Sequence, residues 1–175
     1  MFKKSVLLGL AASLLASAAY AAPVFNRIAS FPVAENAPEA ETTSSEIIAA
    51  SDDGMLLVYS DSPAGGIGMV DITDAKAPKA GGFLAMNGEP TSVTIIGGKA
   101  YVAVNTSESF VAPSGKLVVV DLTTKAIDGE FDLGGQPDSI AHNKDKTILA
   151  IAIENERDED ANDGAIPQAP SGYLV

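Results

Sequence analysis

Pro90-Thr91-Ser92-Val93 and Pro137-Asp138-Ser139-Ile140 are two copies of one motif, set 47 residues apart in the chain. A second motif repeats with nearly the same period, because Val70-Asp71-Ile72-Thr73 returns 50 residues later as Val120-Asp121-Leu122-Thr123. Each copy lies among short runs of Val, Ile and Leu that are separated by Gly, Pro, Asp and Asn, a pattern typical of strands joined by turns. A fixed period of this length indicates a repeated supersecondary unit.

The strand pattern divides the chain after residue 45 into three units, 46–86, 92–133 and 139–175. The first two contain four apolar runs each, and the third contains three. Four strands in a unit of this length are typical of β-propeller blades. A β-sandwich could use the same strands, but it gives no reason for motifs to return at a fixed period. The sequence therefore predicts an all-β fold, a β-propeller of about two and a half four-stranded blades.

Closed propellers have roughly four to eight blades, so this number of blades predicts an incomplete ring. The third unit reaches Val175 inside its third strand, which would leave a sheet edge unpaired. We expect the ring to be completed by missing C-terminal blades, or alternatively by other subunits. The N-terminal segment 22–45 is predicted to contain a lone strand at 25–33 that could complete the last blade of the ring, followed by a linker.

The first residues have the features of a signal peptide. Lys3 and Lys4 precede an apolar run over 6–19, which is followed by the small-x-small sequence Ala19-Tyr20-Ala21. The run is shorter than the roughly 20 residues that span a bilayer. We predict a signal peptide over 1–21, export to the periplasm or the extracellular space, and no stable membrane insertion once the signal is removed.

Composition excludes several classes of function. The 175 residues include 11 Lys and Arg against 23 Asp and Glu, a net charge of −12, with one His and no Cys. Nucleic acid is not expected as a partner, because phosphate binding needs clustered basic residues. Without Cys there is no disulfide framework, thiol nucleophile or zinc ribbon. One His excludes a metal centre with several His ligands from this chain.

Propeller geometry separates the loops into two faces. The connections expected at 61–67, 86–91, 105–114, 134–138 and 154–171 gather on one side, here called the near face, while the opposite side carries tight turns. Long loops on a rigid scaffold are common places for binding. We therefore place any functional site on the near face.

The longest of these loops is strongly acidic. Six carboxylates lie between Glu154 and Asp163, and Arg157 is the single basic residue among them. The alternating oxygen donors of Asp158, Asp160 and Asn162 suit Ca²⁺, although the stretch does not match the full calcium-loop pattern. The sequence leaves open whether this is a metal site or a solvated acidic loop.

Other polar residues in the repeats have structural interpretations. Asp71 and Asp121 follow strands and precede Thr, so we expect them to accept backbone hydrogen bonds in turns. His142 ends a strand without a neighbouring nucleophile motif and is expected to be a surface or packing residue. Gly65-Gly66-Ile67-Gly68 resembles a phosphate loop only superficially, because no helix is expected after it.

Several of these stretches together resemble a family of secreted bacterial β-propellers. They are Leu117 to Leu122, Gln136 to Ile140, Leu149 to Glu156 and the closing Gly172 to Val175. The family is the group of phytase-like esterases and alkaline-phosphatase-like proteins, which is related to choice-of-anchor and YVTN-type repeat propellers. The resemblance covers most of 25–175 and only the N-terminal part of such proteins. Arg157, close to the family's Asn-Glu-Gly-Glu stretch, is a departure from its pattern.

The resemblance implies a function as well as a fold. It implies an exported hydrolase that acts on phosphate or other esters with Ca²⁺, and it leaves this chain alone expected to be inactive. The implied metal ligands are Glu154, Glu156, Asp158 and Asp160, with Asp138 and Glu46 as secondary candidates; no catalytic residue is assigned. The alternative is a non-catalytic propeller whose near face binds a protein or a polysaccharide. The expected partner is accordingly a small ester or a cell-surface polymer.

Overall fold

The computed structural model describes residues 25–175, so the predicted signal peptide lies outside the described residues. No helix in the part that is described is long and apolar enough to cross a membrane. Its helical segments are two short 3-10 turns, η1 (Val33–Glu35) and η2 (Ala161–Gly164). The strands are β1 (Ile48–Ala50), β2 (Leu56–Asp61), β3 (Gly66–Asp71), β4 (Lys79–Ala85), β5 (Glu89–Ile96), β6 (Lys99–Asn105), β7 (Gly115–Asp121), β8 (Ala126–Asp132), β9 (Pro137–His142), β10 (Leu149–Ile153) and β11 (Tyr173–Leu174).

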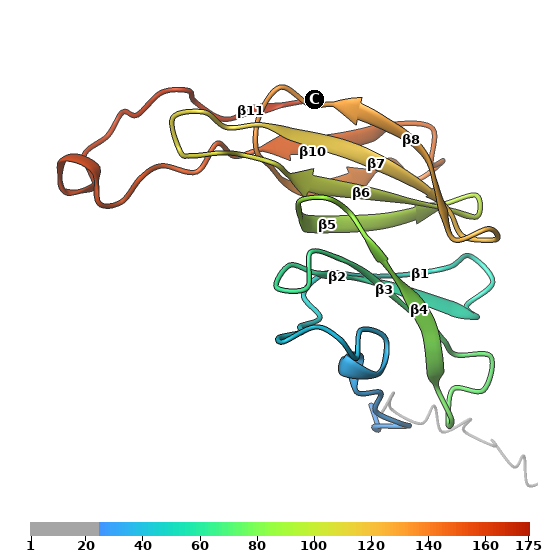
Figure 1. Cartoon of the computed structure of the whole chain (residues 1–175). Coiled ribbons are helices and arrows are strands. Elements are labelled where there is room, and N and C mark those ends of the chain that lie inside the picture. The colour runs from blue at the N-terminus through green and yellow to red at the C-terminus, as the bar shows by residue number, and fades with distance from the viewer. Residues whose placement is uncertain (1–24) are drawn as a thin grey trace, which may run out of the picture.

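The strands form three antiparallel sheets, each from consecutive strands. Their orders are β1-β2-β3-β4, β5-β6-β7-β8 and β9-β10-β11. The molecule is therefore a β-propeller with two four-stranded blades and one three-stranded blade in residues 25–175, and the predicted fold class is confirmed (Figure 1). Since a closed propeller has roughly four to eight blades, these three sheets form part of a ring.

The second sheet packs between the other two. The larger core cluster joins the first and second sheets through residues such as Val58, Met69 and Val102. A smaller cluster joins the second sheet to the third around Leu133, Ile151 and Ile153. The innermost strands β1, β5 and β9 contact one another in that order, as expected for neighbouring blades of a propeller.

The sequence of the second sheet reflects burial on both faces. β7 reads Leu117 to Val120 as an unbroken apolar run, which is the pattern of a strand covered on both sides. In the same sheet, β5 and β6 are joined by a hairpin turn at Gly97 and Gly98, whose φ values are 57° and 80°. A two-residue hairpin turn with both φ values positive strongly favours glycine.

A β-bulge marks the start of the inner strand in two blades. Thr91 in β5 and Asp138 in β9 each lie opposite a register shift and have no Cα partner. The Thr91 hydroxyl donates to the carbonyl of Pro137 at 3.0 Å and so connects the two blades. Bulges redirect side chains at the ends of strands, and here they do so on the near face.

The turns on the opposite side, the far face, meet around Asp52. Its carboxylate forms an ion pair with Lys146, which belongs to the β9–β10 turn of the third blade. The backbone of Gly97 in the second blade also hydrogen-bonds to Asp52, and both contacts lower the pKa of this carboxyl, Lys146 having the larger effect. The three turns between the inner strands and their neighbours therefore converge, as they must around a propeller axis.

The two repeated aspartates have the structural role expected of them. Asp71 Oδ1 accepts a hydrogen bond from the Thr73 amide at 2.9 Å. Asp121 Oδ1 accepts from the amides of Thr123 and Thr124, each at 2.9 Å. Hydrogen bonding to Thr73, first through its side chain and then through its amide, lowers the pKa of Asp71, and the amides of Thr124 and Thr123 lower the pKa of Asp121. The prediction that they stabilise turns is confirmed.

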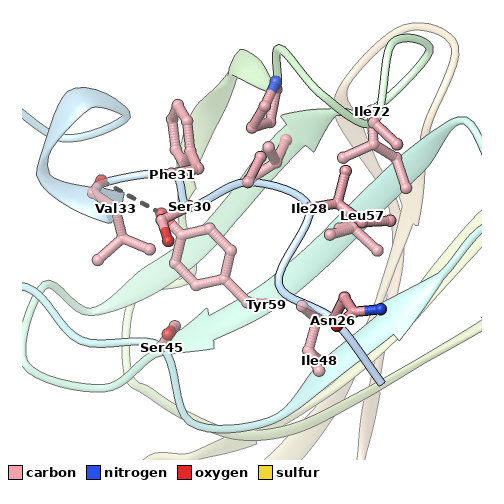
Figure 2. A pocket seen from close by; sticks show the side chains of 14 residues that line it. Asn26, Ile28, Ser30, Phe31, Val33, Ser45, Ile48, Leu57, Tyr59 and Ile72 are labelled. Carbon is pink, nitrogen blue, oxygen red and sulfur yellow. Dashed lines mark hydrogen bonds between the residues drawn. The ribbon is translucent and has the colours of Figure 1, made fainter. Parts of the chain in front are cut away.

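The N-terminal segment crosses the face of the first sheet that lies away from the second sheet (Figures 1 and 2). Residues 25–33 form no strand, contrary to the prediction, and η1 begins at Val33. The segment makes no backbone ladder and lies over a groove of about 440 Å³ that is lined by side chains such as Phe31. The Tyr59 hydroxyl donates to the Val33 carbonyl at 3.3 Å, which fixes the end of the segment.

Candidate functional site

The near face collects the longest loops of the molecule. The β6–β7 loop (106–114) and the β10–β11 loop (154–172) project from the same edge of the sheets (Figure 1). The β8–β9 connection (133–136) lies between them, because Gln136 contacts Glu156. Three loops from two blades therefore meet in one place, which makes this edge the candidate site.

Three of the predicted ligands lie on or just after neighbouring strands where the third blade begins. Asp138 is the bulged residue of β9, while Glu154 and Glu156 follow β10 on the neighbouring strand. Burial raises the pKa of the Glu154 carboxyl above its ordinary value, and the nearby Asp138 and Glu156 carboxylates raise it further. The three side chains thus form a small group of like charges, which a cation or a hydrogen-bond donor would relieve.

Two uncharged side chains that were not predicted as site residues, Asn155 and Gln136, stabilise the conformation of this region. Asn155 is 8% exposed and has a positive φ of 49°. Its Oδ1 accepts from the Gln136 amide at 2.9 Å, and its Nδ2 donates to the Ser171 carbonyl at 3.0 Å. Gln136 Oε1 in turn accepts from the Glu156 amide at 2.8 Å. Asn155 therefore closes the base of the long loop, and Gln136 orients Glu156.

The outer half of the acidic loop is organised around Asp158. Its Oδ1 accepts from the amides of Asp160 and Ala161 at 2.9 and 3.1 Å, as an Asx turn does. The Asp158 backbone also pairs with the side chain of Gln168 through two bonds of 2.9 Å. Oδ1 of Asp158 is therefore already used in hydrogen bonds within the loop. Asn162 follows within η2, with a φ of 51°.

Glu46 lies on a different blade from the other predicted ligands. Its two carboxylate oxygens are 2.9 Å from the Ser44 hydroxyl and 2.6 Å from the Ser62 hydroxyl. The Ser62 hydroxyl is also 2.9 Å from the Pro90 carbonyl of the second blade. Glu46 is therefore hydrogen-bonded at the junction of the first two blades, separately from the other predicted ligands.

The carboxylates suit Ca²⁺ by chemistry but are not arranged as a metal centre. In residues 25–175, no three His, Cys, Asp or Glu side chains are close enough together to hold a metal ion. Glu46 and the group of Asp138, Glu154 and Glu156 belong to different blades, and Asp158 and Asp160 lie further along the loop. A calcium site at these residues stays a prediction.

A cavity of about 230 Å³ lies beside this carboxylate group. Its lining comes from all three loops and combines an aromatic ring, amides, hydroxyls and one carboxylate. Of this lining, only Glu156 was a predicted ligand, and the residues of the β6–β7 loop belong to no motif in the sequence. The lining residues are Asn105, Ser107, Ser109, Phe110, Gln136 and Glu156.

The larger groove beneath the N-terminal segment has a different character. It is lined mainly by apolar side chains, among them Ile28, Phe31, Ile48 and Leu57 (Figure 2). It is a space left where the segment rests on the first sheet, away from the near-face loops. The smaller polar cavity is therefore the better candidate for ligand binding.

Comparison with protein families gives a match over most of the chain. The family model described as the Choice-of-anchor I domain matches residues 46–172, which include strands β1 to β10. No curated protein matches the chain.

Two solved structures share the fold at low sequence identity. Hydrazine synthase of Kuenenia stuttgartiensis superposes with a TM-score of 0.53 at 18% identity, over 63% of this chain and 30% of that one. A luciferin-regenerating enzyme superposes with a TM-score of 0.53 at 15% identity, over 74% of this chain and 43% of that one. The chain thus spans less than half the length of either structure. At these identities the likeness concerns the propeller-like fold alone.

Proposed function

Because this chain belongs to the Choice-of-anchor I domain family, we propose that it is an exported β-propeller of the bacterial surface that binds a surface polymer through its near face. The observation that carries the proposal is the meeting of the 106–114, 133–136 and 154–172 loops around one polar cavity. Rigid sheets with long loops on one side are a common design for binding. The acidic character of the chain, with a net charge of −12, disfavours polyanions as the bound polymer.

Envelope binding by the full chain tests this proposal. Labelled protein is sedimented with purified bacterial envelope, and the bound fraction is compared between a near-face variant, Glu156→Lys, and a far-face variant, Lys144→Glu. We expect the near-face change to reduce binding at least about fivefold and the far-face change to leave it unaltered. Equal loss in both variants, or no binding by the unaltered chain, would contradict the proposal.

A second candidate is ester hydrolysis with Ca²⁺. The like charges around Glu154 favour it, since the repulsion from Asp138 and Glu156 that helps to raise the pKa of Glu154 is what a bound cation would relieve. Bound Ca²⁺ would supply a positive charge for a phosphate or carbonyl oxygen. Basic side chains for a phosphate are scarce here, as Arg157 already lies 3.6 Å from Glu159.

Calcium titration and turnover test the second candidate separately. Calorimetry with CaCl₂ is expected to show binding that is lost in Glu154→Gln and retained in Glu46→Gln. Where phosphate or carboxylate esters are turned over, chelating the metal is expected to stop the turnover. Turnover that is insensitive to the chelator, or the absence of calcium binding, would count against the metal mechanism.

A further inference from the structure

The polar cavity on the near face has the size of a single small ring. Its volume of about 230 Å³ is below the roughly 300–1,000 Å³ of sites that hold drug-sized ligands. It lies between the β6–β7 loop of the second blade and the residues that flank β9 and β10 in the third. A ligand there would therefore contact two blades at once.

The β6–β7 loop is a hairpin that is closed by several hydrogen bonds and carries an exposed aromatic ring at its tip. Thr106 and Ser114 pair through the backbone at 3.0 Å and through their hydroxyls at 2.8 Å. The Ser107 hydroxyl adds bonds to both the amide and the carbonyl of Ser114, at 3.0 and 3.1 Å. Phe110 at the tip is nevertheless 42% exposed. An aromatic side chain on a rigid loop can bind with a small loss of conformational entropy.

Oriented hydrogen-bonding groups lie on both sides of the cavity. Gln136 Nε2 lies 3.4 Å from Glu156 Oε2, and Gln136 Oε1 accepts from the Glu156 amide. Asn105 Oδ1 accepts from the Ser107 amide at 2.9 Å, and its Nδ2 donates to Glu89 at 3.3 Å. An amide NH₂ has two donors and a carboxylate has several lone pairs. Each of these groups can therefore make a further hydrogen bond to a ligand without losing the contact that orients it.

This combination selects among ligand chemistries. The negatively polarised face of an aromatic ring attracts the C–H face of a saturated ring, and amides with a carboxylate suit neighbouring hydroxyls. An anionic ligand is disfavoured by Asp138, Glu154 and Glu156. We propose that this cavity binds one neutral sugar unit of a polysaccharide, with Phe110 stacked on the ring and Glu156, Gln136 and Asn105 bonded to its hydroxyls. The inference rests on the proposed surface-binding function and names its ligand class.

Binding to a panel of oligosaccharides tests this assignment. The probes are trisaccharides of glucose, galactose, mannose and N-acetylglucosamine, with a galacturonic acid trimer and a glucosamine trimer as anionic and cationic comparisons. We expect the full chain to bind at least one neutral trisaccharide with a dissociation constant of about 1 mM. Phe110→Ala should weaken this binding roughly tenfold, and Phe110→Tyr should retain it.

The matched control is Val111→Ala. Val111 is the next residue of the same tip, is 80% exposed and does not line the cavity, so its truncation should change affinity less than about twofold. Unchanged melting temperatures would show that every variant is folded. The assignment is overturned if no neutral trisaccharide binds, if Phe110→Ala binds as well as the unaltered chain, or if only the glucosamine trimer binds. Envelope binding that still depends on Glu156 in those cases would leave the proposed function standing.

Discussion

At the scale of single residues, the side-chain amide of Asn36 replaces a missing peptide group in the first sheet. A β-bulge leaves Gly81 without a Cα partner, and β4 shifts register between Met69 and Val70 of β3. Asn36 Nδ2 donates to the Met69 carbonyl at 2.8 Å, and Asn36 Oδ1 accepts from the Gly82 amide at 3.2 Å. Buried backbone groups need partners, so the N-terminal segment is joined to the sheet through this residue.

Removing that amide should destabilise the whole chain. Asn36→Ala leaves the buried Met69 carbonyl and the Gly82 amide without their partner, and we expect a loss of about 1–3 kcal/mol in the free energy of unfolding. Chemical denaturation measures it. The exposed neighbour Glu35 provides a control, since Glu35→Ala should change stability by less than about 0.5 kcal/mol. Equal effects of the two changes would contradict the role of Asn36.

Glu154 should make stability depend on pH. Its pKa is raised above the ordinary 4.5, first by burial and then by Asp138 and Glu156, so the folded state holds this proton more tightly than the unfolded state. The resulting stabilisation is present below pH 4.5 and is lost as the pH rises through the folded-state pKa. Glu154→Gln should remove this part of the pH dependence of the melting temperature. Asp138→Asn should move it to lower pH, and an unchanged profile in both variants would refute the charge coupling.

At the scale of elements, the acidic loop behaves as a closed unit because Asn155 ties its two ends together. Asn155 joins the end of β10 to Ser171, just before β11, and both flanks are further held by Tyr173, whose hydroxyl donates to the Leu133 carbonyl at 2.8 Å. The long loop therefore depends on a few polar contacts at its base. Its interior contains no fully buried apolar side chain between 156 and 172.

Opening that base should release the loop without unfolding the sheet. Asn155→Gly allows the positive φ of 49° but loses the bonds to Gln136 and Ser171. We expect faster amide exchange and proteolysis within 156–171, with β10 unchanged. Asn162→Gly is the matched control, because Asn162 also has a positive φ, of 51°, and is exposed. Similar exchange in both variants would show that Asn155 does not close the loop.

The sequence predicted the elements better than the site for a physical reason. Short apolar runs such as Leu117 to Val120 recur with the blades between turn residues, so the strands can be recognised from the sequence. The site depends on single side chains, Gln136 and Asn155, whose contacts come from loop geometry that has no periodicity. The strand expected at 25–33 was wrong for a related reason. Its apolar residues suggested a paired strand, but the segment lies across a sheet face without a strand partner, and Phe25 and Ile28 stay exposed.

At the scale of the whole molecule, the two blade interfaces differ in strength. The interface between the first and second sheets contains most of the buried apolar side chains, including Met69, Val102 and Val118. The interface between the second and third sheets has a smaller core around Ile151 and Ile153, and at the exposed far face an ion pair between Lys146 and Asp52 links the third blade to the first. Exposed ion pairs contribute little to stability, so the third blade should separate more easily.

Native-state hydrogen exchange tests this order of stability. Because local openings with few buried contacts cost less free energy, amides of β9 and β10 should exchange at a lower free energy than those of β5 to β7. Ile153, which is 2% exposed, is the residue to truncate, and Ile153→Ala should speed exchange in the third blade while leaving β2 and β3 unchanged. Met69→Ala, at the larger interface, should instead affect both the first and second sheets, with a loss of about 2–5 kcal/mol. A single exchange free energy for all three sheets would contradict this order. It would mean that the three blades unfold as one cooperative unit despite the smaller core between the second and third sheets.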